Sequence, residues 1–258
     1  MAAGVSVLDA LRLAVGTLSA VPVRVGRADR DTAGRAMVWA PAVGALLGGA
    51  AGGVAWLAST LGTAPLLTAA VAVATLAALT RGLHLDGLAD VADGLGSGRP
   101  AEEALRIMKA SDIGPFGVVT LVLALLVQVA ALAEAFDAGY GGVALVTSAA
   151  TGRLAITWAC VRGVPAARPE GLGAWVAGTV PVPVATAATA VLLVAATLLG
   201  LLGGPYPAQW LLAPLAGLAA AAVLLHRAVR RLGGITGDVL GALAETAATV
   251  TLLALALG

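Results

Sequence analysis

Three aspartates are crowded into one short segment of this sequence. Asp86, Asp90 and Asp93 follow one another at spacings of four and three residues, which places their side chains on one face of a helix. Neighbouring carboxylates on such a face lie about 5–6 Å apart and repel one another, so a cation must neutralise them or water must solvate them fully. Carboxylate oxygens suit Mg²⁺, which keeps several waters and accepts phosphate oxygens as further ligands. The segment therefore predicts a magnesium site for phosphoryl transfer, and a merely solvated acidic face is the alternative.

His84 and a basic segment flank the aspartates. His84 could act as a general base, a metal ligand, a donor to phosphate or a packing residue, and the sequence leaves these roles open. Further along, Arg106, Lys109 and Ser111 precede a turn that contains glycine. Two cations and a hydroxyl beside a carboxylate–magnesium site suit a diphosphate substrate. Anchoring of a helix at a membrane surface is the alternative for this segment.

The elements that must position these residues are membrane-spanning helices. Of the 258 residues, 60% are hydrophobic and only 11% are charged, whereas about 25% are charged in soluble domains. Runs of about 20 apolar residues can cross a hydrocarbon core about 30 Å thick. Such runs occupy residues 37–61, 64–80, 113–133, 142–161, 182–202, 208–225 and 236–257. We expect an all-α, polytopic transmembrane helix bundle with about seven spans, in a single domain over residues 1–258.

The segment before the first span differs from the others. Residues 5–21 are apolar but include Asp9 and Arg12, and Pro22 ends the run. We expect an interfacial or re-entrant helix here, with a full eighth span as the alternative.

The distribution of basic residues tests this arrangement. With seven spans, fourteen of the 15 Lys and Arg residues fall on one side, and the positive-inside rule assigns that side to the cytoplasm. They are Arg12, Arg24, Arg27, Arg30, Arg35, Arg81, Arg99, Arg106, Lys109, Arg162, Arg168, Arg227, Arg230 and Arg231. The acidic segment lies on the same side, so we expect a cell-membrane protein whose active site faces the cytoplasm. A net charge of +1 gives no ground for nucleic-acid binding.

Two ionisable residues fall inside expected spans. Arg153 lies within residues 142–161 and Glu245 within residues 236–257, a span that also begins with Asp238. Charges at membrane depth are costly, so they face a bundle interior and either mark function or fix helix packing. Their opposite charges make Arg153 and Glu245 expected partners.

The sequence around the aspartates closely resembles that of a known family. LHLDGLADVADG at residues 83–94 and IMKASDIGPFG at residues 107–117 are similar to motifs of the cobalamin synthase family, the adenosylcobinamide-GDP ribazoletransferases. The resemblance extends through most of the chain and includes ARPEGLG at residues 167–173 and GGITGDVLGA at residues 233–242.

This resemblance implies a magnesium-dependent membrane enzyme that completes cobalamin assembly. Adenosylcobinamide-GDP would react with α-ribazole, or its 5′-phosphate, to give adenosylcobalamin, or its phosphate, and GMP. A ribose hydroxyl would attack the cobinamide-bound phosphorus, while Arg106 and Lys109 stabilise the leaving phosphate and a carboxylate or His84 accepts the proton. The substrate-binding residues that we expect are Arg106, Ser111, Arg168, Glu170, Asp238 and Glu245.

Two rival functions deserve comparison with this one. CDP-alcohol phosphotransferases also pair carboxylates on membrane helices, but the arginine of their motif is absent after Asp86. A transporter would place its polar groups near the middle of the bilayer, often in repeated halves, whereas these acids lie at one face and no internal repeat is evident. The number of metal ions, the lower-ligand base and homo-oligomer formation stay open.

Overall fold

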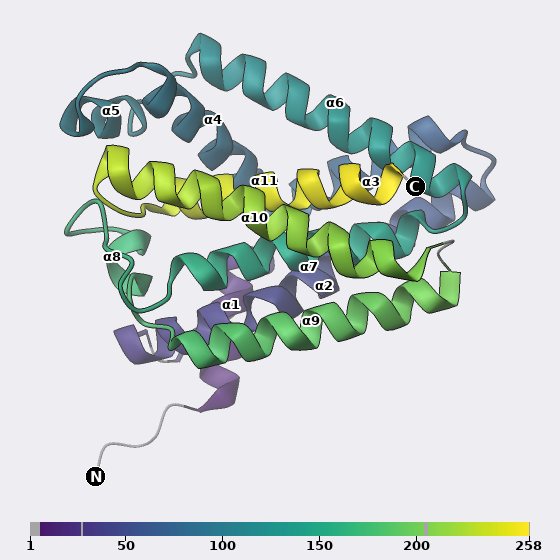
Figure 1. Cartoon of the computed structure of the whole chain (residues 1–258), viewed down its shortest axis with the longest axis horizontal. Helices are drawn as coiled ribbons and strands as arrows, with labels where there is room; N and C mark the ends of the chain where they lie inside the picture. Colours follow the sequence, from purple (N-terminus) through teal and green to yellow (C-terminus); the bar gives the residue numbers. More distant parts are fainter. Residues whose placement is uncertain (1–5, 27, 204–205, 258) are drawn as a thin grey trace.

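A computed structural model describes residues 6–26, 28–203 and 206–257. This part of the chain contains eleven helices. Most of the long helices run in roughly the same direction, and α4, α5 and α8 gather at one end of the bundle (Figure 1). The helices are α1 Val7–Leu18, α2 Arg30–Thr60, α3 Pro65–Leu79, α4 Leu83–Gly96, α5 Ala101–Ile107, α6 Pro115–Asp137, α7 Gly141–Ala159, α8 Leu172–Val176, α9 Val182–Gly203, α10 Pro207–Leu232 and α11 Gly237–Ala256. The all-α membrane fold is thus confirmed.

Each expected span coincides with a helix, but the count of seven is not confirmed. Within the described residues, five helices are long and apolar enough to cross a membrane, or six if α3 and α4 form one broken span. α3 has only 15 residues. α7 is enclosed by other helices over most of its surface, so it contacts protein rather than lipid and can carry Ser, Thr and Arg side chains.

The N-terminal helix α1 does not form an eighth span. It has 12 residues and is therefore about 18 Å long, which is too short for a hydrocarbon core of about 30 Å. It packs against α2, and an interfacial or re-entrant position for it stays a prediction. Arg27, one of the basic residues of this region, lies outside the described residues.

A sharp bend separates α3 from α4. The two helix axes differ by 89°, and two of the three linking residues, Arg81 and Gly82, have positive φ angles, of 54° and 67°. Glycine adopts this left-handed conformation without steric cost, and Gly82 occupies the position immediately before α4. The bend carries α4 away from the axis of α3 to the end of the bundle (Figure 1). The side chain of Asp86 on α4 is exposed. α3 and α4 together therefore form either a broken span or a re-entrant segment.

Candidate active site

Close packing of α4 against α11 brings two of the aspartates near a third acid. A Cβ atom on Gly87 would lie only 2.6 Å from the backbone oxygen of Asp238, so the two helices touch at this point with nothing between their backbones. Asp86 and Asp90 stand on either side of Gly87 along α4. As a result, the Asp90 carboxylate interacts electrostatically with both Asp86 and Asp238.

Replacing Gly87 with Ala tests this contact. The added methyl group would overpack the helix contact, at a cost of about 1–3 kcal/mol, and would move Asp90 away from Asp238. We expect at least a roughly tenfold loss of turnover and a lower unfolding temperature, because a shift of about 1 Å in a site can be that costly. Gly49→Ala is the control, since a Cβ there meets nothing within 4 Å. Equal effects of the two substitutions would contradict the proposed contact.

A short pairing between two distant loops adds an arginine to the acids. The Ile235 N–H donates to the Pro165 oxygen at 2.9 Å, and the Ala167 N–H donates to the Ile235 oxygen at 3.0 Å. Arg168 follows directly and interacts electrostatically with Asp90 and Asp238. Its guanidinium also donates to a backbone oxygen of α5, so it ties α5 to the site.

The resulting group, which we call the acidic cluster, consists of Asp86, Asp90, Asp238 and Arg168. It holds three carboxylates against one guanidinium, which leaves an excess of negative charge. Burial, together with the neighbouring carboxylates of Asp86, Asp238 and Asp93, raises the pKa of Asp90 from 3.8 to about 7, and Arg168 opposes this shift. Such a group has a strong electrostatic reason to bind a cation.

Asp93 has a different position from the other two aspartates of α4. Its side chain is buried, and its two carboxylate oxygens accept hydrogen bonds from the backbone N–H groups of Gly114 at 2.7 Å and Gly117 at 2.9 Å. A carboxylate at this point satisfies unpaired N–H groups at the start of α6 and opposes the positive end of its dipole. The geometry therefore gives no support to the expectation that Asp93 binds metal, and it gives Asp93 a structural role.

We therefore expect Asp93→Ala to lower stability rather than only activity. The substitution leaves the Gly117 N–H buried without a partner, and hydrogen bonds to a charged group contribute about 1.5–3 kcal/mol each. Thermal unfolding of the purified protein should show a clearly lower midpoint than the wild type. Asp112→Ala, which removes an exposed carboxylate nearby, should leave the midpoint unchanged. An unchanged midpoint for Asp93→Ala would refute the structural role.

A buried polar group lies beneath the acidic cluster. The Nδ1 atom of His84 lies 3.1 Å from a guanidinium nitrogen of Arg153, and both side chains are buried. Glu245 accepts a hydrogen bond of 2.9 Å from Gln128. Arg153 and Glu245 line a common cavity of about 20 Å³, which has room for one water. In the described part of the chain no direct ion pair joins them, so the expected partnership acts across this cavity.

The positions of His84 and Glu245 bear on their expected roles. His84 is directed toward Arg153 in the interior, rather than toward the exposed carboxylates. Glu245 is likewise a residue of the bundle interior. The geometry therefore favours helix packing over proton transfer for His84, and over substrate contact for Glu245.

The remaining expected site residues are exposed at the same end of the bundle. Arg106, Lys109, Ser111 and Glu170 all have exposed side chains. They lie at the same end as the acidic cluster but, among the described residues, do not contact it through a hydrogen bond or ion pair.

One residue near the site was missed by sequence reasoning. Arg30, at the start of α2, donates hydrogen bonds to the backbone oxygens of Ala174 and Ala177 and thereby holds α8 in place. Together with Arg168 it lines a cleft of about 540 Å³. In the sequence Arg30 cannot be distinguished from the other arginines of the basic side, because its partners are backbone atoms far along the chain.

The donor set of the acidic cluster fits a Mg²⁺ ion that shares its coordination between the protein and the substrate. Within the described residues, no three His, Cys, Asp or Glu side chains converge as a complete metal site. Mg²⁺ is commonly held by one or two carboxylates, waters and substrate phosphates rather than by a protein cage. One or two of Asp86, Asp90 and Asp238 would supply those carboxylates, and the substrate would complete the coordination.

Fold and site together define an integral membrane protein with a carboxylate-rich site at one end of a helix bundle. The chain belongs to the cobalamin-5-phosphate synthase family, whose family model matches residues 10–256. An adenosylcobinamide-GDP ribazoletransferase of Frankia casuarinae is 43% identical over 260 residues, covering 95% of this chain and 94% of the relative. Proteins with the same name from Nocardioides sp. (43% identical, 95% and 97% covered) and Bradyrhizobium diazoefficiens (38%, 96% and 93%) are also similar. No solved structure matches the chain.

Proposed function

We propose that this protein joins adenosylcobinamide-GDP to α-ribazole, or its 5′-phosphate, and releases GMP. The family membership and the names of the full-length relatives support this activity over a CDP-alcohol phosphotransferase or a transporter. The observation that carries the proposal is the acidic cluster itself. It collects three carboxylates and an arginine from three separate segments at one end of the bundle.

We infer that Asp86, Asp90 and Asp238 hold Mg²⁺ together with the substrate diphosphate. When bound, the ion would neutralise charge on the diphosphate. Arg168 is placed to bind and orient a phosphate oxygen beside the carboxylates, and positioning of this kind is a large part of catalysis in phosphoryl transfer. A site carboxylate is better placed than His84 to accept the proton of the attacking ribose hydroxyl, because His84 is buried against Arg153.

The exposed basic residues Arg106 and Lys109 are proposed to act on the leaving group. Arg106 and Lys109 lie at the same end as the acidic cluster and are free to approach the leaving GMP phosphate when substrate binds. Nearly all Lys and Arg residues of the chain are expected on this side, so we infer that the site faces the cytoplasm from the cell membrane.

The test is GMP release by the purified protein in lipid vesicles, supplied with adenosylcobinamide-GDP and α-ribazole. We expect turnover with Mg²⁺, loss of turnover when EDTA is in excess, and recovery when Mg²⁺ is restored. Activity that resists EDTA would refute the metal role alone. Absence of GMP release under every metal condition would refute the proposed reaction.

A further inference from the structure

Two neighbouring cavities away from the acidic cluster share part of their lining. The first, of about 730 Å³, lies at the end of the bundle among α1, α2 and the start of α9. The second is an apolar groove of about 350 Å³ between α2, α7 and α9. Val38 and Trp39 line both cavities, so a polar chamber at the end of the bundle adjoins an apolar groove between the spans.

The chamber at the end of the bundle carries positive charge. Its lining includes Arg30, Arg35 and Arg162 against a single acid, Asp31. The Arg162 side chain is exposed, and no protein group in the described part of the chain hydrogen bonds to it. This excess of positive charge favours an anion, and the exposed Arg162 guanidinium can bind a phosphate in bidentate fashion.

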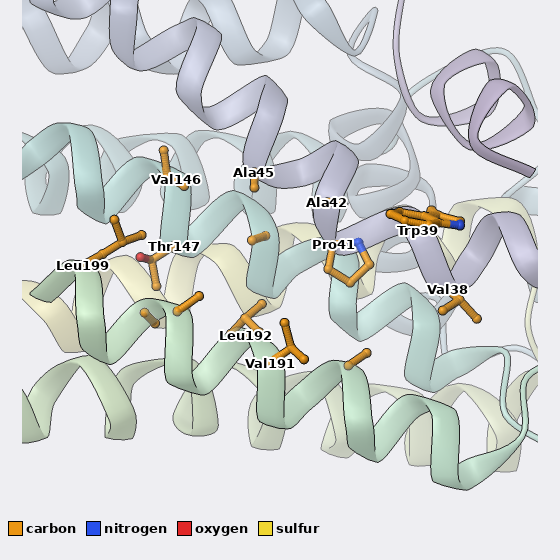
Figure 2. A pocket seen from close by; sticks show the side chains of 14 residues that line it. Val38, Trp39, Pro41, Ala42, Ala45, Val146, Thr147, Val191, Leu192 and Leu199 are labelled. Atoms are coloured by element: carbon orange, nitrogen blue, oxygen red, sulfur yellow. The ribbon is translucent and has the colours of Figure 1, made fainter. Parts of the chain in front are cut away.

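The groove has the length of one lipid leaflet. Figure 2 shows Val38 and Trp39 at one end and Leu199 at the other, with small side chains such as Ala42 and Ala45 between them. Along α9, the lining extends from Ala188 to Leu199, which corresponds to about 16 Å at the rise of an α-helix. Half of a hydrocarbon core of about 30 Å is about 15 Å. One acyl chain can therefore lie along the groove.

We propose that the two adjoining cavities together bind one anionic phospholipid. Its phosphate is held by Arg162 in the chamber, and one acyl chain fills the groove between α2 and α9. Trp39 lies at the boundary between the two parts, which is the depth at which tryptophan is enriched in membrane proteins. A free phosphate would match the positive charge of the chamber but leave the apolar groove empty. A zwitterionic lipid would fill the groove with an acyl chain but carries no net negative charge to match the chamber. An anionic phospholipid satisfies both.

Lipid retention measured by native mass spectrometry tests the headgroup part of the proposal. Delipidated protein in detergent is titrated with phosphatidylglycerol or with phosphatidylcholine of identical acyl chains. We expect wild-type protein to prefer phosphatidylglycerol, and Arg162→Gln to reduce this preference about fivefold, the effect of one arginine on an anionic lipid. Arg227→Gln is the control, because Arg227 is an exposed arginine on α10 outside the cavity. Equal retention of both lipids by the wild type, or equal behaviour of the two variants, would overturn the proposal.

A second pair of variants tests the acyl-chain part. Ala195 and Ala190 are both exposed on α9, but only Ala195 lines the groove. Ala195→Phe should reduce retention of both lipids at least about fivefold by filling the groove, whereas Ala190→Phe should not. Millimolar inorganic phosphate should leave bound phosphatidylglycerol in place. Displacement by phosphate, or equal retention by the two Phe variants, would show that the groove does not hold a chain and would contradict the proposal.

Discussion

Asp90→Asn is expected to reduce GMP release by roughly 100-fold to 1,000-fold, the range found when one electrostatic stabiliser of a transition state is removed. Asparagine keeps the size of the side chain and removes its negative charge. Asp90 is the member of the acidic cluster whose carboxylate interacts with Asp86, Asp238 and Arg168 together. Its loss should therefore weaken both metal binding and the position of Arg168. Turnover under saturating Mg²⁺ and substrate measures the effect, and Asp112→Asn is the control.

The same variant should not lose stability, and this separates a site residue from a structural one. The pKa of Asp90 is raised from 3.8 to about 7 by burial and by neighbouring carboxylates. A carboxyl group with a raised pKa contributes stability below pH 4, and this contribution is lost as the pH rises through 7. Without metal at pH 8, Asp90→Asn should therefore unfold at the same temperature as the wild type or higher. A lower midpoint together with lost activity would instead indicate a folding defect.

Arg153→Met should destabilise the protein strongly, by about 3–5 kcal/mol, which is the usual cost of leaving a buried charge without its counter-charge. The substitution removes the partner of His84 and leaves the Glu245 carboxylate buried across the shared cavity without a compensating charge. The midpoint of thermal unfolding in detergent measures the loss. Arg227→Met, at an exposed position, should have little effect.

A double variant distinguishes charge coupling from simple loss of packing. When Arg153→Met is combined with Glu245→Met, no charge remains unpaired in the interior, and apolar replacements of a whole buried pair are often tolerated. We expect the double variant to recover part of the stability that the single variant lost. If the double variant is at least as unstable as the sum of the two single variants, Arg153 and Glu245 are not coupled.

Much of the fold could be predicted from the sequence, because hydropathy is a local property. Every expected span corresponds to a helix, and the spacing of Asp86 and Asp90 predicted the helix that became α4. The count of spans was less secure, since length and hydropathy do not reveal which helix is surrounded by the others. α7 carries Arg153 and several hydroxyl side chains because its neighbours shield it from lipid.

The site was predicted only in part, because its decisive contacts are long-range. The carboxylate of Asp93 shares a helical face with the other two aspartates in sequence, but its partners Gly114 and Gly117 lie 21 and 24 residues away. Asp238 and Arg168 were expected to contact substrate, yet nothing in their local sequence placed them beside Asp90. The loop pairing around Ile235 does so.

Direct binding of Mn²⁺, a paramagnetic substitute for Mg²⁺, tests the central claim that the acidic cluster holds a divalent cation. Electron paramagnetic resonance of the free ion, measured during titration of purified protein with substrate diphosphate present, gives stoichiometry and affinity. We expect saturable binding by the wild type and by Asp112→Asn, and affinity at least about tenfold weaker in both Asp90→Asn and Asp238→Asn. Unchanged affinity in those two variants would contradict the claim.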